Sequence, residues 1–377
     1  RWLNLNKKVS DKPGTVQFFG KSLSKIHPSI SIRLRKEKRH MLEAFYATER
    51  GSLEDATING GFDLHPELVW LDLIAPSQEE QQWVLDAYNQ NLPTLKSLED
   101  ISSSARFYRD DDGILHISTY FLTKNKNYQV DGDAEDSSHM LAMVQTVAFI
   151  LHKDRLFTLR GEKLVAFRAF RARARRNDYE MDYKDPTWIL LGLLEAKLDE
   201  LADILEDIHK DLEKYSTEVL NNHQREQILD LDDMITRLAQ QEDMLGKAQL
   251  CLIDLRRVLT FLSRPRALGS HIYDADIREL SEDVRSLVEH DAFLFQKVRF
   301  LLDTTSGFIN TEQNDTIRRF SILPSMLAPP MLIASIYGMN TDVLPFAHGT
   351  TSFIIVLLII IGFFIGPIIY FRWKKWI

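Results

Sequence analysis

Four residues near the end of the chain, Tyr337 to Asn340 with the sequence YGMN, could bind a cation without carrying any charge. They stand between two long apolar segments. Gly338 is suited to end a helix, and the last carbonyls of a helix carry partial negative charge that attracts cations. The amide oxygen of Asn340 can accept hydrogen bonds from the water shell of an ion, whereas Met339 offers only a thioether. These residue types predict a neutral contact site for a hydrated cation at a helix end.

The rest of the chain shows no signature of an enzyme. We find no phosphate-binding loop, no nucleophile motif and no His/Cys cluster for zinc. Oxygen ligands suit Mg²⁺ instead. The single cysteine, Cys251, is expected to be buried, in keeping with a reducing compartment.

Charge is distributed unevenly along the chain. The net charge is −8, but residues 1–40 carry eleven Lys/Arg against two Asp/Glu. The remaining body is therefore acidic, which argues against nucleic acid as a partner and is compatible with metal cations. An arginine cluster interrupts the acidic body, and a solvated helix face is its expected role; the cluster is Arg168, Arg171, Arg173, Arg175 and Arg176.

Two segments are long and apolar enough to cross a bilayer. Phe353 to Phe371 is nineteen residues without a charge, and Ser321 to Thr341 is also uncharged although three prolines interrupt it. Arg318 and Arg319 precede the first span and Arg372, Lys374 and Lys375 follow the second, while the loop Asp342–Ser352 has no Lys or Arg. The positive-inside rule places both termini in the cytoplasm, in an inner (plasma) membrane, with the loop outside. Two helices are too few to enclose a path, so conduction would need several subunits.

The preceding part reads as a small α/β domain followed by long helices. A strand is predicted at Val69–Leu73, a helix from Ser77, and hairpins turning at Asp110–Gly113 and His152–Asp154. Apolar residues then recur at alternating spacings of four and three from Leu194 to Val219, which predicts a long helix with a heptad seam.

A second heptad seam runs from Ile277 to Phe308 and leads into the first apolar span. It predicts one helix from about Ile272 to Tyr337, on the order of 100 Å long. Its polar members Asp291 and Thr305 are unusual in a dry core. We expect them to face a wet axis shared by several copies of the chain.

Taken together, these residues resemble the CorA family of divalent-cation channels. The resemblance covers residues 41–377 and is carried by the GMN sequence and by several longer stretches: VWLDLIAP from Val69, LEDI from Leu98, SARFYRDDDG from Ser104, RLFTLRGEKLVAFR from Arg155 and FLFQKVRFLLDTTSGFINTEQN from Phe293. It implies a homopentameric funnel: an α/β cytoplasmic domain, a long-helix, coiled-coil-like stalk and a two-helix transmembrane hairpin in the lipid bilayer. The implied function is influx of Mg²⁺, with Co²⁺ and Ni²⁺ also carried, driven by the membrane potential.

The resemblance also implies which residues contact the ion. Five copies of Asn340, with Gly338 and Met339 and supported by Tyr337, would form the selectivity filter at the outer end of the first span. Counting back without a gap places the remaining pore-lining positions at Asn314, Phe320, Ala328 and Met331. Met331 departs from the threonine common in relatives, and Phe320 would make a bulkier hydrophobic constriction than leucine. The external loop reads VLPF where relatives read MPEL, so Asp342 is its only acid.

In the family, Mg²⁺ closes the pore by bridging acids of neighbouring subunits. The family's LEDI acid pair falls on Glu99 and Asp100, and the partner acid on the stalk counts to Glu279, with Asp283 nearby. Mg²⁺ would thus be both substrate and regulator.

The domain boundaries follow from these segments: a basic N-terminal extension outside the resemblance at 1–40, the α/β domain at 41–185, long acidic antiparallel helices at 186–265, the stalk helix at 266–320, spans at 321–341 and 353–371 around the external loop 342–352, and a basic cytoplasmic tail at 372–377. Two other readings stay open. One is a zinc transporter of the related branch that bears GIN, against which Met339 argues. The other is a membrane-anchored coiled-coil scaffold or sensor that conducts nothing.

Overall fold

The computed structural model of the protein describes residues 42–49, 51–56, 68–99, 106–124, 142–176, 181–222, 231–265, 267–339 and 350–374. All of them belong to one compact unit, Leu42–Ile377. The other unit, Arg1–Met41, contains the predicted basic extension and lies outside the described residues.

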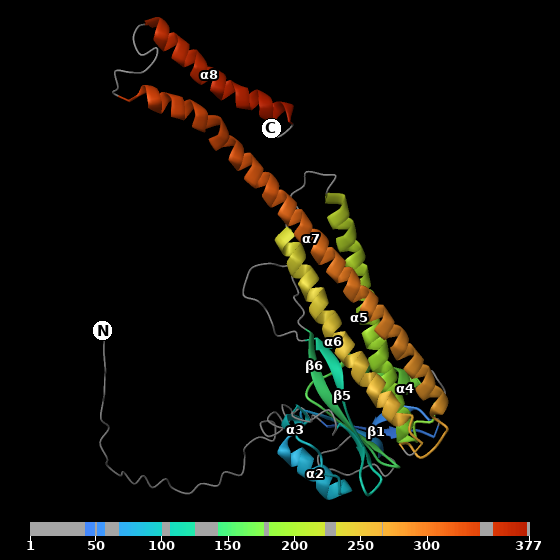
Figure 1. Ribbon diagram of the computed structural model, residues 1–377. Helices are drawn as coiled ribbons and strands as arrows, with labels where there is room; N and C mark the ends of the chain where they lie inside the picture. Colours follow the sequence, from blue (N-terminus) through green and yellow to red (C-terminus); the bar gives the residue numbers. More distant parts are fainter. Residues whose placement is uncertain are drawn as a thin grey trace, which may run out of the picture. The chain divides into compact units, whose positions relative to one another are not determined.

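A seven-stranded sheet forms the base of the described unit (Figure 1), with the order β2-β1-β3-β7-β6-β5-β4. Its strands are β1 (Leu42–Ala47), β2 (Leu53–Ala56), β3 (Leu68–Ile74), β4 (Phe107–Arg109), β5 (Leu115–Lys124), β6 (Ala142–Leu151) and β7 (Leu156–Arg160). The central pair β3 and β7 is parallel, and the other described pairs are antiparallel. The predicted α/β class is confirmed, and the predicted strand Val69–Leu73 lies inside β3, whose seven residues are all buried.

Both predicted hairpins are present. Between β4 and β5, the Gly113 amide donates to the Asp110 carbonyl at 3.0 Å, and Gly113 has a φ of 82°, which glycine adopts without strain. Between β6 and β7, the His152 amide donates to the Arg155 carbonyl at 2.9 Å. These turns set the register of the two antiparallel pairs.

Helices cover the two faces of the sheet. One face packs on α2 (Gln78–Tyr88) and α3 (Leu95–Glu99), in a core that includes Val84 and Leu98. A capping box between Ser77 and Glu80 begins α2, as the predicted start at Ser77 requires. The other face packs on α4 (Val165–Arg176), α5 (Pro186–Asn222) and α6 (Leu231–Leu262).

The stalk bundle consists of α5, α6 and the first half of α7 (Asp274–Tyr337), which lie side by side in Figure 1. Both predicted heptad seams are confirmed. The α5 seam from Leu194 to Val219 is buried throughout, and on α7 the apolar seam members are buried or half-buried. The hydrophobic seams bury these faces against one another and so hold the long helices together.

The expectation that Asp291 and Thr305 face a shared wet axis is wrong. Both have an exposed fraction of 0% in a single chain, because the α7 seam packs against α5 and α6 of the same protomer. The Thr305 hydroxyl donates to the Leu301 carbonyl of its own helix at 2.7 Å. Neither carboxylate oxygen of Asp291 has a hydrogen-bond partner among the described residues.

A buried polar network joins the stalk bundle to the sheet. The Asp254 carboxylate on α6 accepts hydrogen bonds from the Thr119 hydroxyl at 2.5 Å and the Tyr120 amide at 2.9 Å, both on β5. Lys197 on α5 donates to the same Thr119 oxygen at 2.8 Å and lies 3.9 Å from Asp254. Burial lowers the pKa of Lys197. The network holds α5 and α6 on the sheet, because separating Lys197 from Asp254 would leave an unpaired charge in the core.

The arginine cluster on α4 is more than a solvated face. Arg171 pairs with Glu43 on β1, Arg175 with Asp55 on β2, and Arg173 with Asp199 on α5 at 2.8 Å. The cluster therefore ties α4 to neighbouring elements. Sequence reasoning missed this because the acidic partners lie 26 to 128 residues away in the chain.

Candidate functional site

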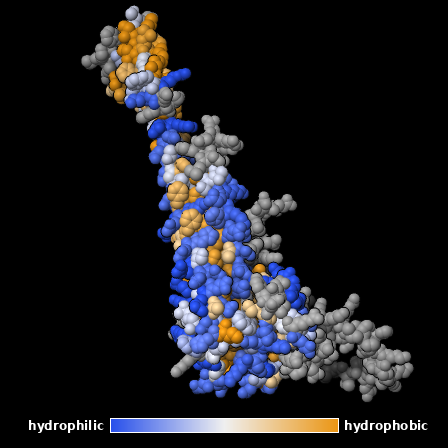
Figure 2. All heavy atoms as spheres, turned by 90° about the vertical axis from the view of Figure 1, so that its right-hand side faces the viewer, coloured by the Kyte–Doolittle hydropathy of each residue, from blue (hydrophilic) through white to orange (hydrophobic). Residues whose placement is uncertain are grey.

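The last part of α7 leaves the stalk bundle and meets α8 (Thr350–Trp373). All residues from Asn310 to Ser321 are exposed, so no part of the described chain covers this stretch of α7. Beyond it, both helices are apolar enough to cross a membrane, and almost none of their apolar windows is buried. Figure 2 shows apolar side chains gathered at this end of the molecule, above a mostly hydrophilic stalk. By composition and length, this end suits a lipid environment.

Within this pair, α8 covers one face of α7. On α7, Ile322 is buried and Met326, Ile333 and Tyr337 are half-buried. At about 100° per residue these four positions share one side of the helix. They define what we call the covered face of α7.

The predicted pore positions lie on the opposite side of α7, the open face. Asn314, Phe320, Ala328 and Met331 are all exposed, with exposed fractions of 75% for Phe320 and 70% for Met331. The same helical angle places the four within about a third of the circumference. The structure therefore brings them onto one face that the described chain leaves free.

Pro324, Pro329 and Pro330 lie inside α7 and do not end it. Figure 1 shows that the upper part of α7 bends away from the axis of its lower part, and prolines are a common cause of such bends. A proline nitrogen cannot donate, so the carbonyls of Phe320, Ser325 and Met326 lose their usual helical partner. These carbonyls add oxygen acceptors to an otherwise apolar segment.

The helix ends where the sequence predicts, although its glycine has an unexpected conformation. Gly338 follows the last helical residue, with a φ of −82° and a ψ of −7°, which is right-handed. Its amide donates to the Ala334 carbonyl at 2.9 Å, and a Cβ built on Gly338 would lie 3.3 Å from that same oxygen. Gly338 thus permits a tight final turn, and Met339 after it is exposed. Asn340 and Asp342 lie outside the described residues.

One exposed acid on the open face escaped the sequence reasoning. Asp303 lies eleven residues before Asn314, which is about three helical turns and puts both on the same face. No sequence motif marks Asp303. It is recognised only in the structure, because it lies on the face of α7 that α5 and α6 do not cover. It is a negative charge below the predicted pore positions.

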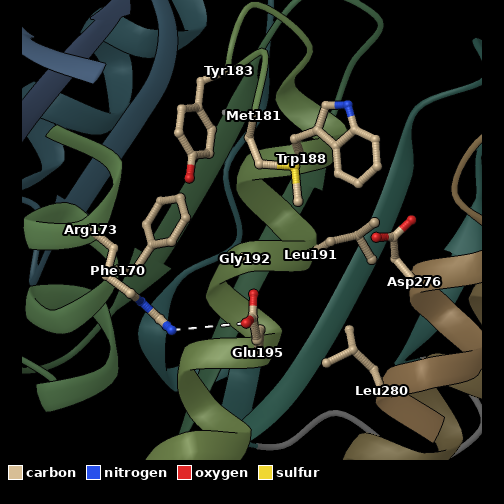
Figure 3. Close-up of a pocket in the computed structure, with 10 residues that line it drawn as sticks. All are labelled: Phe170, Arg173, Met181, Tyr183, Trp188, Leu191, Gly192, Glu195, Asp276 and Leu280. Carbon is tan, nitrogen blue, oxygen red and sulfur yellow. Dashed lines mark ion pairs between the residues drawn. The ribbon is translucent and has the colours of Figure 1, made fainter. Parts of the chain in front are cut away.

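The predicted regulatory acids Glu279 and Asp283 are exposed near the base of α7. A small pocket lies between α4, α5 and α7; its lining residues, labelled in Figure 3, include Leu280, the residue after Glu279. In this pocket the Arg173 guanidinium lies 3.9 Å from the Glu195 carboxylate. Burial raises the pKa of Glu195, Arg173 opposes that shift, and the negative charges of Asp199, Glu279 and Asp276 add to it. The base of α7 therefore has a local excess of negative charge.

Of the other predicted regulatory pair, the structure describes only the backbone of Glu99, at the end of α3. Glu99 ends α3, which packs on the opposite face of the sheet from α4 and α5, and Asp100 lies outside the described residues. Among the residues that the structure describes, no three His, Cys, Asp or Glu side chains are grouped so as to hold a metal ion. A metal bridge from the end of α3 to the acids at the base of α7 would have to come from a second copy of the chain, because the sheet separates the two within one chain.

Comparison with known proteins gives a consistent result. A family model described as "CorA-like Mg2+ transporter protein" matches residues 66–375. The magnesium transport protein CorA of Salmonella typhimurium is 40% identical over 320 residues, covering 82% of this chain and 92% of that protein. The proteins of the same name from Escherichia coli K12 and Haemophilus influenzae are 40% and 38% identical, with the same coverage.

Two solved structures share the fold. The CorA magnesium transporter of Methanocaldococcus jannaschii has a TM-score of 0.69 at 18% identity, covering 89% of this chain and 99% of that one. The full-length CmaX protein has a TM-score of 0.61 at 16% identity, covering 90% of this chain and all of that one. At these identities the two matches speak for the architecture only.

Proposed function

Because this chain belongs to the CorA family, we propose that it is a membrane channel for Mg²⁺ influx, driven by the membrane potential. Membership in a transporter family agrees with the expectation that it is not an enzyme. Co²⁺ and Ni²⁺ are proposed as further cargo. About 2.3 kcal/mol per charge per 100 mV gives a dication a driving force of roughly 4.6 kcal/mol.

The observation that supports the proposal most strongly is the division of α7 into two faces. The covered face contacts α8, while the open face presents Asn314, Phe320, Ala328 and Met331 with no partner in the described chain. Two helices cannot enclose a path. A ring of copies, five as in the homopentamer that the resemblance implies, would place the open faces around one axis and α8 outside, against lipid.

The chemistry of this face suits a hydrated dication. Mg²⁺ gives up its water reluctantly, so neutral oxygen groups can bind the hydrated ion without demanding dehydration. The segment from Ser321 to Met339 has no charged residue. Asn340, following Gly338 and Met339 and supported by Tyr337, would form the outer ring of amides, and Asn314 the inner one. Phe320 between them would exclude water from the closed pore.

Charges at the two ends of the path would set its electrostatics. Asp303 on the open face would attract the dication as it leaves the narrow segment. At the outer end Asp342 is the only acid of the external loop. The loop therefore attracts cations to the pore mouth less strongly than the loop of relatives that have a glutamate there. Asn340 therefore takes a larger share of the selectivity in this chain.

For regulation, we propose that Mg²⁺ closes the channel by bridging Asp100 and Glu99 of one subunit to Glu279 and Asp283 of its neighbour. The local excess of negative charge at the base of α7 supports this, because a dication there would relieve the repulsion that contributes to the raised pKa of Glu195. Since α7 is continuous from this base to Tyr337, a movement at the base can reach the membrane segment.

We propose that the channel lies in the inner (plasma) membrane with both termini in the cytoplasm. The basic residues that flank the two apolar segments, Arg318, Arg319, Arg372 and Lys374, support this orientation by the positive-inside rule.

Flux into vesicles tests the function. Purified protein reconstituted into vesicles with an inside-negative potential should take up Mg²⁺, and Asn340→Ala should reduce the rate at least tenfold. The matched control is Asn222→Ala, an asparagine at the end of α5, which should leave uptake unchanged. No uptake by the wild type would leave the scaffold reading standing, and uptake of Zn²⁺ but not Mg²⁺ would favour the zinc branch.

A further inference from the structure

Asp291 is a buried carboxyl group without a hydrogen-bond partner among the residues that the structure describes. It occupies a seam position of α7, its exposed fraction is 0%, and neither carboxylate oxygen has a hydrogen-bond partner. The neighbouring seam residues Leu287 and Leu294 are apolar. Buried carboxylates are nearly always paired or hydrogen-bonded, so this position requires a physical explanation.

The position of Asp291 in the bundle follows from contacts across the helices. The rings of His209 on α5 and His290 on α7 have centroids 5.7 Å apart, and Lys297 on α7 pairs with Glu213 on α5. Asp291 therefore lies level with the middle of the α5 seam. In the hydrophobic core of the stalk bundle, α5 supplies buried leucines and isoleucine such as Leu205 and Ile208, and α6 supplies Leu245 and Ala248.

The other titratable groups at this level do not neutralise Asp291. They are Glu206, His209, Lys210 and Glu213 on α5, Asp243 and Lys247 on α6, and Glu289, His290 and Lys297 on α7. Several of them are paired near the surface: Glu206 with Lys210 at 2.7 Å, Asp243 with Lys247 at 2.5 Å, and Glu289 with Arg285 of the same helix at 3.7 Å. Burial alone raises the pKa of Asp291 to about 6, with no contribution from any of these charges.

A proton is the one ligand that such a group accepts without rearrangement of the bundle. Protonation removes the negative charge from the apolar seam, whereas ionisation leaves an uncompensated charge between three helices. The ionised group gains by reaching water, which requires α7 to separate locally from α5 and α6.

We propose that Asp291 is a proton-binding site of the stalk bundle, and that its protonation tightens the packing of α7 on α5 and α6 while its ionisation loosens it. The stalk then responds to the proton concentration on its own side of the membrane. Asp291 lies 23 residues before Asn314 on one continuous helix, about 35 Å along the axis, so the loosened segment belongs to the same helix as the open face. The proton site itself does not depend on the proposed conduction.

Amide hydrogen exchange of the full-length protein in detergent tests the proposal. Exchange of peptides covering Val284–Val298 is compared at about pH 5 and about pH 7.5, corrected for the intrinsic pH dependence of exchange. Local opening that restores the ordinary pKa of 3.8 to Asp291 becomes about tenfold more frequent over this range. Wild-type protection should fall by that factor, and Asp291→Asn should show no fall.

Glu289→Gln is the matched control, because it removes one negative charge from the same turn of α7 on its exposed side. It should behave like the wild type. Equal wild-type protection at the two pH values would overturn the proposal, as would an undiminished fall in Asp291→Asn. If Asp291→Asn does not fold, the comparison of wild-type protection at the two pH values still decides whether the proposal holds. A wild type that transports Mg²⁺ but shows no pH-dependent protection would refute the proton site and leave the proposed function intact.

Discussion

Replacement of Asp254 by alanine is expected to be among the most destabilising single changes in the stalk bundle. The carboxylate is 3% exposed and accepts bonds from the Thr119 hydroxyl and the Tyr120 amide. It is also the nearest negative charge to Lys197, which is 2% exposed. Asp254→Ala would leave that ammonium buried without its counter-charge, and it would remove the acceptor of the Thr119 hydroxyl, the Tyr120 amide and the Arg106 guanidinium, which lies 3.4 Å from the carboxylate.

The magnitude follows from these contacts. Removal of one partner of a buried ion pair costs about 3–5 kcal/mol, because the remaining charge stays uncompensated. For a body of this size, this corresponds to a fall of roughly 10 °C in the thermal midpoint. The assay is thermal unfolding of the full-length protein in detergent at a single scan rate.

The matched control is Asp243→Ala on the same helix. Asp243 is more than half exposed and pairs with Lys247 one turn away, a kind of contact worth about 0.3–0.5 kcal/mol. The double variant Lys197→Met/Asp254→Leu removes the fully buried pair and leaves only Arg106, which is partly exposed, without Asp254; it should recover part of the loss. Equal midpoints for Asp254→Ala and Asp243→Ala would refute the assignment of the network as a lock between the stalk bundle and the sheet.

Three further outcomes are expected. Gly192→Ala should lower the free energy of unfolding by about 1–3 kcal/mol, because its Cβ would lie 2.4 Å from the Phe170 ring. Gly246→Ala, with open space around it, should raise the free energy of unfolding by up to about 1 kcal/mol. Similar denaturation midpoints for the two variants would contradict this. Asp291→Leu should stabilise the protein by about 3 kcal/mol above pH 6, because the pKa of Asp291 is raised from 3.8 to about 6 in the native state. The wild type therefore loses stability as the pH rises through 6. In thermal unfolding, the advantage of the variant should vanish below about pH 4. Millimolar Mg²⁺ is expected to protect the wild type from limited proteolysis, and Asp100→Ala with Glu279→Ala should weaken that protection. Unchanged protection would show that other acids form the regulatory site.

Periodicity and turn chemistry predicted much of this fold. The seams from Leu194 and from Ile277, the two hairpins and the helix end at Gly338 are all local patterns, and each is confirmed by the structure. A heptad seam shows that a helix face is buried but not which helix covers it. For that reason Asp291 was wrongly assigned to an axis between copies.

Contacts between distant residues could not be predicted from the sequence. Lys197 and Asp254 are 57 residues apart on different helices, and no spacing rule connects them. The ion pairs of the α4 arginines were missed for the same reason. Among the candidate site residues, the open face places Asn314, Phe320, Ala328 and Met331 together, whereas their role in conduction rests on the family and stays a prediction.

The central claim is that the open face of α7 lines the ion path while the covered face does not. Variants with one added cysteine test it directly, because the natural Cys251 is fully buried and burial raises the pKa of its thiol to about 11, so Cys251 should not react. Met331→Cys and Ile333→Cys lie two residues apart on opposite faces. After treatment with a charged thiol reagent, Mg²⁺ flux through Met331→Cys should be blocked and flux through Ile333→Cys should persist. Block of Ile333→Cys together with unaffected flux through Met331→Cys would contradict the account.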